Sequence, residues 1–243
     1  MVGSGELVGL WGDDHPDLDR VADAQLDDRA AVALTRGRYP KDYGHVDPNE
    51  DAVLAANGPA GWLLAVADGH FGFDAARAAL GLVAARAPDL LGGSGNPTRA
   101  LEDLCRAARA AVVDAVAELE RPRRDSATAL TLALVTGGHL HVVTYGDTVC
   151  LRGRGGKAKV VGESGPFLDP HAGLHEVVRV RMRARDRVAV GSDGLTTYLG
   201  HDWPARLAEV LDEEDEPRVA ARRLLELAMT GGAGDHVSVG VLL

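Results

Sequence analysis

The sequence predicts a single α/β domain, residues 1–243, in which antiparallel sheets are covered on the outside by helices. Short apolar runs of β type follow one another with hairpin-type turns between them, which favours antiparallel pairing over parallel crossovers. Segments with helical apolar spacing separate these groups of runs. No internal repeat is visible, and a hydrophobic fraction of 46% is ordinary for a chain that buries a core.

The β-type runs are short, apolar and bounded by turn residues such as Asn57-Gly58-Pro59 and Gly137-Gly138. In chain order they are Ala52–Ala56, Trp62–Ala67, Thr128–Val135, His139–Tyr145, Thr148–Arg152, Glu176–Met182, Arg187–Val190 and His236–Leu243. Because the turns between them are tight, neighbouring runs are expected to pair with each other.

Four segments carry the helical spacing, namely Phe73–Arg86, Pro97–Glu120, Ala205–Leu211 and Pro217–Met229. The first is expected to end before Pro88, because proline removes a backbone donor and clashes with the preceding turn. The second is expected to begin with Asn96 as its cap and Pro97 in its first turn. Gly231-Gly232 is expected to stop the last one.

Composition and charge exclude several classes of function. A net charge of −10 argues against general binding to nucleic acid or to anionic membranes. The segment Met1–Asp14 lacks the pattern of a signal peptide, and the apolar runs are too short to span a bilayer. Cys105 and Cys150 have no motif around them, so we expect reduced, buried thiols in a cytoplasmic protein.

The most informative residues are aspartates that begin or end an apolar run, namely Asp51, Asp68, Asp147, Asp193 and Asp235. An acid at the end of a buried strand is costly unless something positive compensates its charge. No basic residue stands beside these acids in the sequence, so they indicate metal ions. Ligation by carboxylates alone suits Mg²⁺, Mn²⁺ or Ca²⁺ rather than zinc or copper.

Each of these acids lies in a short block, and the blocks are Asn49-Glu50-Asp51-Ala52, Val66-Ala67-Asp68-Gly69-His70, Val143-Thr144-Tyr145-Gly146-Asp147, Val190-Gly191-Ser192-Asp193-Gly194-Leu195 and Gly234-Asp235-His236-Val237-Ser238-Val239. Their order and spacing resemble the metal-dependent protein serine/threonine phosphatases of the type 2C (PPM) family, in its short bacterial form. The resemblance extends from about Gly44 to Leu243. It implies a four-layer α-β-β-α sandwich of two antiparallel sheets flanked by helix pairs, with metal ions at one end of the sheets.

The resemblance also assigns metal ligands. Asp68 would bridge two Mn²⁺ or Mg²⁺ ions, and the carbonyl group of Gly69 would bind one of them. Asp193 and Asp235 would complete the other. Asp147, together with Asp193, would hold a third and looser ion.

The remaining roles concern water and the proton. Asp51, with Glu50 beside it, would hold metal-bound waters, and His70 would protonate the leaving alkoxide. Two cations roughly 4 Å apart lower the pKa of a bridging water, so that hydroxide can attack phosphorus in line. Phosphoserine and phosphothreonine have poor leaving groups, so an acid such as a histidine adds a further ~10²–10⁴-fold.

The arginine with which the family grips the substrate phosphate is absent. The stretch before the Glu50 block reads His45-Val46-Asp47-Pro48 and contains no arginine. Arg36 and Arg38, or the nearby Lys41, are the candidates to bind phosphate in its place.

Three further positions depart from the family pattern. Phe71 follows the Asp68 block where a small residue is usual, and His236 stands where asparagine is usual. A short Gly- and Pro-containing loop, Gly162–Leu174, replaces the segment that contributes to substrate choice. The metal ligands are unaffected by these changes, whereas phosphate affinity and specificity are expected to differ.

Three functions are therefore compatible with the sequence. The favoured one is metal-dependent hydrolysis of phosphoserine and phosphothreonine in proteins, in a signalling role. A phosphatase for a small phosphorylated molecule is the second, and a weakly active regulatory or binding module is the third. Taken singly, Asp51 and Asp147 could be turn acids and His70 a structural histidine, so the assignment depends on the blocks as a set.

Arg179, Arg181, Arg183 and Arg185 alternate with apolar residues, so in one extended strand all four would point to the same side. Basic residues on the solvent face of an edge strand block aggregation. Alternatively, the Arg179–Arg185 stripe could dock an acidic or phosphorylated protein substrate.

Overall fold

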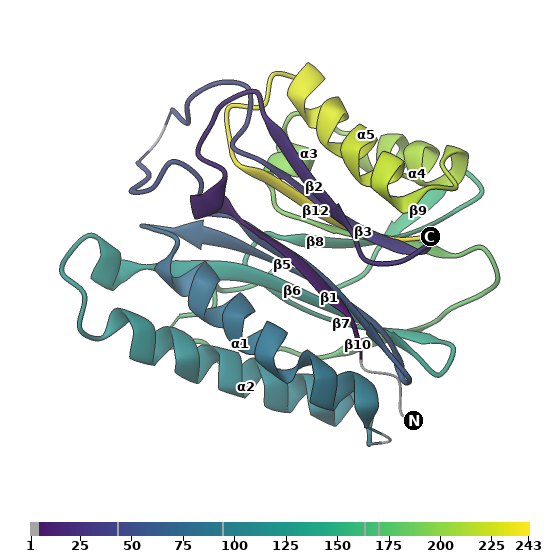
Figure 1. The fold of residues 1–243 in the computed structure, drawn as a ribbon, viewed down its shortest axis with the longest axis horizontal. Coiled ribbons are helices and arrows are strands. Elements are labelled where there is room, and N and C mark those ends of the chain that lie inside the picture. The colour runs from purple at the N-terminus through teal and green to yellow at the C-terminus, as the bar shows by residue number, and fades with distance from the viewer. Residues whose placement is uncertain (1–4, 43, 94, 163, 170) are drawn as a thin grey trace.

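The computed structural model describes residues 5–42, 44–93, 95–162, 164–169 and 171–243. Its layers are two helices, two sheets packed face to face, and a further group of helices (Figure 1). The first sheet has the order β1 (Leu7–Trp11), β4 (Ala52–Gly58), β5 (Gly61–His70), β6 (Ala127–Thr136), β7 (His139–Tyr145) and β10 (Val178–Arg181). The second has the order β2 (Val21–Gln25), β3 (Ala30–Thr35), β12 (Val237–Leu242), β11 (Arg187–Gly191), β8 (Val149–Arg154) and β9 (Lys157–Val160).

All the strand pairs in both sheets are antiparallel. The helices are α1 (Asp74–Gly92), α2 (Pro97–Val116), α3 (Gly194–Thr197), α4 (Trp203–Glu213) and α5 (Pro217–Thr230), with short 3₁₀ turns at Gly12–Asp14 and Arg123–Asp125. Helices α1 and α2 cover the first sheet, and α4 and α5 cover the second (Figure 1). None of the helices in the described ranges is long and apolar enough to cross a bilayer.

Three apolar cores hold these layers together. Strand β5 shows how the sequence builds two of them at once, because successive side chains point to opposite faces. Leu63 and Ala65 pack with α1 and α2, whereas Leu64 and Val66 pack against the second sheet. A third core lies between the second sheet and α4 and α5. Burial on both faces explains why the strands read as nearly continuous apolar runs.

The prediction that the first helix ends before Pro88 was wrong, because α1 continues to Gly92. Proline removes one backbone donor but does not stop a helix whose last turn is held by tertiary contacts. Leu91 in that turn is 1% exposed, and its carbonyl accepts the amide of Ala60 at 2.8 Å. The expected Asn96 cap is confirmed, since its side chain accepts the amide of Arg99 at 3.2 Å. Helix α2 ends at Val116, earlier than the expected Glu120.

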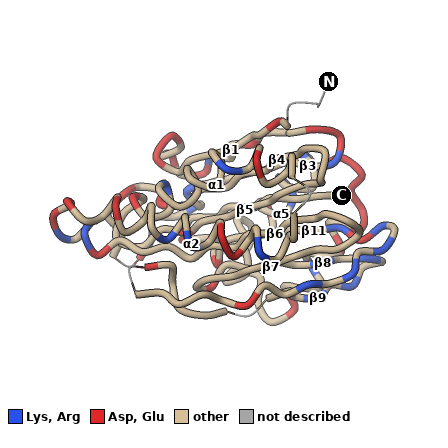
Figure 2. Tube along the Cα trace, turned by 90° about the horizontal axis from the view of Figure 1, so that it is seen from below, with Lys and Arg blue, Asp and Glu red and all other residues tan. Residues whose placement is uncertain are grey.

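The expectation that the Arg179–Arg185 stripe is one extended strand was also wrong. Strand β10 ends at Arg181, and Arg185 adopts a left-handed φ of 66° in the turn that follows. Arg183 lies beyond the strand, in a groove of about 210 Å³ lined also by basic residues of β8 and β9. Blue segments gather around β8 and β9 in Figure 2, so the basic surface extends across these two strands.

Candidate active site

Antiparallel pairing in the first sheet places two of the predicted acids side by side. Ala67 of β5 lies opposite Ala52 of β4, so Asp68 and Asp51 occur at the same end of the sheet. The backbone there is tight, because a Cβ at Gly69 would lie 2.6 Å from the Glu50 carbonyl oxygen. Gly69 is therefore required where these two strand ends meet.

The second sheet brings the other acids to the same end. Gly191 of β11 lies opposite both Val149 of β8 and Val239 of β12. The turns next to these positions carry Asp147, Asp193 and Asp235. Their charges act on those of the first sheet, since the pKa of Asp68 is raised partly by Asp51 and Asp193. The structure thus gathers the predicted metal ligands in one region.

Asp51 is buried with half of its carboxylate unsatisfied. Ser238 of β12 donates its hydroxyl to Asp51 Oδ2 at 2.7 Å, whereas Oδ1 has no hydrogen-bond partner among the described residues. Burial raises the pKa of Asp51 to about 7, and the charge of Asp235 adds to the effect of burial. A buried, unsatisfied oxygen of this kind indicates a site for a cation.

Each of the neighbouring aspartates Asp68, Asp193 and Asp147 has either a raised pKa or a buried oxygen without a partner among the described residues. Burial raises the pKa of Asp68 well above its usual value. Burial also raises the pKa of Asp193, with contributions from Asp235 and Asp147. The Oδ1 atom of Asp147 is a second buried oxygen without a hydrogen-bond partner among the described residues.

Lys41 brings a positive charge into this acid cluster. From the sequence it was a candidate only for binding phosphate. Its Nζ lies 2.8 Å from Asp235 Oδ1, and the two side chains are only 5% and 7% exposed. Burial opposes the ammonium form, but the charges of Asp235, Asp68 and Asp51 outweigh it and raise the pKa of Lys41. Lys41 is therefore a buried counter-ion of the cluster.

Within the described ranges, no three His, Cys, Asp or Glu side chains are placed so that they could hold one metal ion. The donor chemistry nevertheless fits a hard divalent cation. The cluster offers carboxylate oxygens, two of which are buried without a partner.

Glu50 organises the loop around the cluster. Its Oε1 accepts the amides of Val46 at 2.9 Å, Asp47 at 3.1 Å and Gly72 at 2.7 Å. Its own amide donates to Nδ1 of His236 at 3.1 Å. Burial lowers the pKa of His236 to about 3, so the ring is neutral and can accept this bond. The role of Glu50 in holding metal-bound water remains a prediction.

His70 lies at the end of β5, partly buried, with its ring packed on Phe167 at 4.4 Å between centroids. Its Nδ1 has no hydrogen-bond partner among the described residues. Phe167 belongs to the loop Gly162–Leu174, of which Glu163 and Pro170 lie outside the described residues. The loop is anchored where the Gly146 amide donates to the Pro166 carbonyl at 2.9 Å. It therefore positions the ring of His70.

The expected phosphate-binding arginines contact other parts of the chain. Arg36 donates from Nη1 to the carbonyl of Pro16 at 2.7 Å. Arg38 is exposed and lies over the ring of Tyr39, 5.9 Å from its centroid. Of the three basic residues considered from the sequence, Lys41 is the one that contacts the acid cluster.

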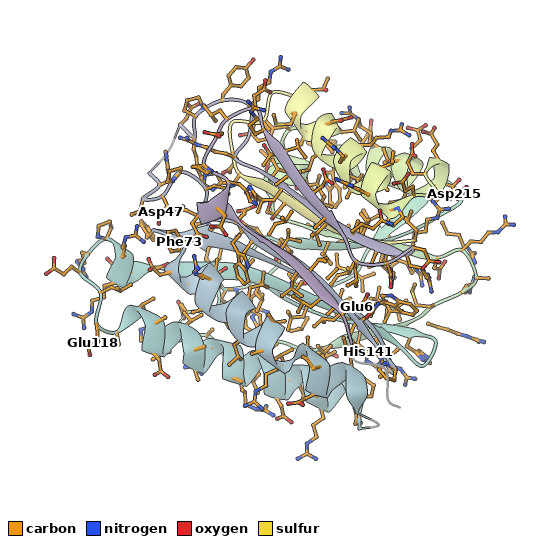
Figure 3. The ribbon with its side chains drawn as sticks, in the orientation of Figure 1. Glu6, Asp47, Phe73, Glu118, His141 and Asp215 are labelled. Atoms are coloured by element: carbon orange, nitrogen blue, oxygen red, sulfur yellow. The ribbon has the colours of Figure 1, made fainter. Side chains whose placement is uncertain are left out.

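Arg123 is a cation near the loop that Glu50 holds, and no motif in the sequence pointed to it. It pairs with Asp74 at 2.7 Å and with Asp47. Asp47 also accepts the amide of Phe73 at 3.1 Å, and Figure 3 shows these two residues side by side where β5 leads into α1. Phe71 lies in the same turn and is 51% exposed, so its ring faces solvent beside the site.

A model of the protein phosphatase 2C family matches residues 42–227. The chain belongs to the protein phosphatase 2C family. The resemblance and the sandwich fold inferred from the blocks are thus confirmed. The serine/threonine protein phosphatase PstP of Mycobacterium tuberculosis is 30% identical over 224 residues, 79% of this chain and 41% of the relative. The chain therefore spans about two fifths of the length of that curated relative.

Solved structures of serine/threonine phosphatases have a similar fold. A crystal structure of M. tuberculosis PstP/Ppp has a TM-score of 0.70 at 28% identity, covering 88% of this chain and 97% of that one. The PstP catalytic domain in complex with two manganese ions has a TM-score of 0.69 at 27% identity, covering 91% and 98%. MsPP of Mycobacterium smegmatis, in complex with cacodylate, has a TM-score of 0.66 at 27% identity, covering 88% and 97%.

Proposed function

We propose that this 2C-family chain hydrolyses phosphoserine and phosphothreonine in proteins, using two Mn²⁺ or Mg²⁺ ions and a third that binds more loosely. The observation that carries the proposal is the convergence of aspartates at one end of the sheets. Asp51 and Asp147 each have a buried oxygen without a partner among the described residues, and the pKa values of Asp51 and Asp68 are raised. Such a cluster is stable in its charged form only beside cations. The manganese-bound structure of the PstP catalytic domain supports the same conclusion.

The metal ligands would be Asp68, Asp193, Asp235 and Asp147 with the carbonyl of Gly69, while Asp51 and Glu50 would hold metal-bound waters. When bound, the ions supply an activated hydroxide and neutralise the phosphoryl oxygens. Ser238 holds one oxygen of Asp51, and the other is buried without a partner among the described residues.

His70 would give its proton to the leaving alkoxide. Phe167 packs against its ring and fixes where that ring lies. Nδ1 of His70 is buried and has no hydrogen-bond partner within the described ranges, so no protein group competes for this nitrogen. In this proposal His70 is the general acid, and Asp68 is the ligand shared by the two metal ions.

We propose that the phosphoprotein substrate docks on the basic surface formed by Arg179 and Arg181 of β10 and the groove next to them. That groove is lined by the basic residues Arg152, Arg154, Lys157, Lys159 and Arg183 and by one acidic residue, Asp186. In a chain with a net charge of −10, such a gathering of cations favours an acidic or phosphorylated segment. Neither nucleic acid nor membrane is proposed as a partner.

We also propose that residues 1–243 act as one catalytic domain in the cytoplasm, in signalling. Strands β1 to β3 support the single domain, because β1 pairs with β4 in the first sheet and β3 with β12 in the second. The cysteines Cys105 and Cys150 are free and buried, as expected for a reducing compartment.

The test has two steps. Hydrolysis of p-nitrophenyl phosphate with Mn²⁺ and with EDTA separates an active phosphatase from a binding module, and activity that survives EDTA would contradict the proposal. A panel of phosphopeptides then tests the substrate class. Turnover of small phosphomonoesters without turnover of phosphopeptides would instead support the small-molecule alternative. Charge reversal at Arg152 and Arg183 should raise the KM for acidic phosphopeptides and leave p-nitrophenyl phosphate unaffected.

A further inference from the structure

The inference concerns Lys41, which lies between β3 and β4 and enters the acid cluster from outside the aspartate blocks. Its ammonium is 2.8 Å from Asp235 Oδ1, and both side chains are almost completely buried. The charges of Asp68 and Asp51 also act on it. A buried lysine is tolerated only where carboxylates compensate its charge, so this position is determined by the cluster.

The charge on Lys41 does not neutralise the cluster. Asp51 Oδ1 and Asp147 Oδ1 are buried and have no hydrogen-bond partner among the described residues with Lys41 in place. One ammonium therefore stabilises Asp235 and leaves the other carboxylates in need of positive charge. A divalent ion would satisfy more of them, because it carries more charge and accepts several oxygen ligands at once.

Lys41 and a divalent ion would compete for Asp235, because the ammonium already lies 2.8 Å from Oδ1 of that carboxylate. An ion bound to the same oxygen would be repelled by the ammonium held there. The lysine can leave, because its ammonium is carried on a flexible four-carbon chain. Departure of the ammonium would also free Asp235 to turn toward the remaining carboxylates.

We propose that Lys41 is a resident cation of the metal-free site, which a divalent ion must displace from Asp235 when it binds. This inference rests on the metal site of the proposed function and adds a regulation to it. Metal binding and release of Lys41 are then one coupled event, and the lysine lowers the affinity for the ion. It also protects the metal-free fold against repulsion between the aspartates.

The first test measures Mn²⁺ affinity by isothermal titration calorimetry in the full chain and in the variant Lys41→Met. Loss of the competing cation should tighten binding, by roughly 5- to 150-fold if the coupling is of usual size. The same variant should melt at a lower temperature in EDTA, because Asp235 loses its counter-ion. Arg86→Met, at an exposed cation of α1, is the matched control and should leave the affinity for Mn²⁺ unchanged. Unchanged or weaker binding in Lys41→Met would overturn the inference.

The second test uses the unmodified protein, so it does not depend on how a variant folds. Amine acetylation followed by mass spectrometry of peptides reports the reactivity of each of the lysines, Lys41, Lys157 and Lys159. In EDTA, Lys41 should react much more slowly than the exposed Lys157 and Lys159. Saturating Mn²⁺ should accelerate acetylation of Lys41 several-fold and leave the other two unchanged.

The outcomes separate this inference from the proposed function. If the unmodified protein binds no Mn²⁺, both fail. If it binds Mn²⁺ while the reactivity of Lys41 stays constant, the metal site stands and the displacement of Lys41 is wrong.

Discussion

Asp27 and Asp51 are both acids of the same sandwich, but they have opposite surroundings. Asp27 lies in the turn between β2 and β3, at the end of β3 far from the acid cluster. Its Oδ1 accepts the amides of Arg29 and Ala30, both at 2.8 Å, and its Oδ2 accepts Asn57 Nδ2 at 2.9 Å and Trp62 Nε1 at 3.0 Å. Burial opposes its ionisation, yet these hydrogen bonds lower the pKa of Asp27.

Asp51 shows what happens when donors are missing. It keeps the hydroxyl of Ser238 on one oxygen, has no partner for the other within the described ranges, and has a pKa raised to about 7. This fold can surround a carboxylate with donors, as it does at Asp27. The acids of the cluster are therefore suited to receive a cation, whereas Asp27 already has hydrogen-bond donors on both oxygens and stabilises the fold.

Removing an acid of the cluster is expected to have the largest effect, and the effect is on activity. Asp68→Ala or Asp193→Ala should lower metal-dependent activity by at least ~10³-fold, because each would remove a proposed ligand. Metal-free stability should stay the same or rise by about 1 kcal/mol, since one of several repelling carboxylates is gone. Steady-state kinetics with Mn²⁺ and urea unfolding in EDTA measure the two quantities. Full activity in either variant, or a large loss of metal-free stability, would contradict the interpretation.

His70 tests whether the unsatisfied Nδ1 beside the cluster is also functional. His70→Ala should slow hydrolysis of a phosphoserine peptide by ~10²–10⁴-fold, because a poor leaving group needs its proton. Hydrolysis of p-nitrophenyl phosphate should fall much less, since that phenolate leaves without protonation. Parallel kcat measurements on the two substrates give the answer. Equal losses would remove the acid role and leave His70 as a structural residue.

Asp27→Ala removes the acid whose oxygens are fully hydrogen-bonded. The change leaves the indole of Trp62 and two backbone amides without their acceptor, so the free energy of unfolding should fall by about 1–3 kcal/mol. Activity with Mn²⁺ should not change below the unfolding transition. Urea unfolding at a fixed Mn²⁺ concentration provides the measurement. A stability equal to that of the unmodified protein would mean that Asp27 is not the structural acid described above.

The smallest expected effect is on pH dependence. The pKa of Asp51 is raised from 3.8 to about 7, so the folded state prefers its protonated form. Its contribution to metal-free stability is full below about pH 4 and is lost as the pH rises toward 7, by an amount on the order of 1 kcal/mol or more. The pH dependence from Asp27 has the opposite sign. Its contribution to stability is present above the ordinary pKa of an aspartate and is lost as the pH falls through the lowered pKa of Asp27.

Melting in EDTA between pH 5 and 8 checks this prediction. The unmodified protein should lose stability relative to Asp51→Asn as the pH rises, and saturating Mn²⁺ should remove that trend. A constant difference between the two proteins across the range would contradict the raised pKa of Asp51.

The aspartates were predictable because each interrupts an apolar run, and local pattern alone reveals a charge at a strand end. Asp68 and Gly69 illustrate this, although β5 continues through them to His70 and does not end at the predicted Ala67. Lys41 was not predictable, because its partner Asp235 is distant in sequence and only the sandwich brings them together. The contact of Phe167 with His70 likewise depends on how a loop lies across two strands.

Parts of the fold were missed for similar reasons. Strand β2 reads Val-Ala-Asp-Ala-Gln, with a mixed pattern that gives little local sign of a strand. It forms because β3 offers it a partner edge. Helix α1 passes Pro88 because Leu91 is buried, and a local rule about proline does not include that contact.

The bonds that join Asp51 to Ser238 and Glu50 to His236 connect one sheet to the other at the site. An ion held by Asp68 of the first sheet and Asp235 of the second would link the two sheets at the end of the sandwich that carries the site. Separation of the sheets would then require loss of the ion, so proteases and hydrogen exchange should attack the loaded protein more slowly at this end than at the other. The proposed metal site would thus also control how fast the two sheets separate.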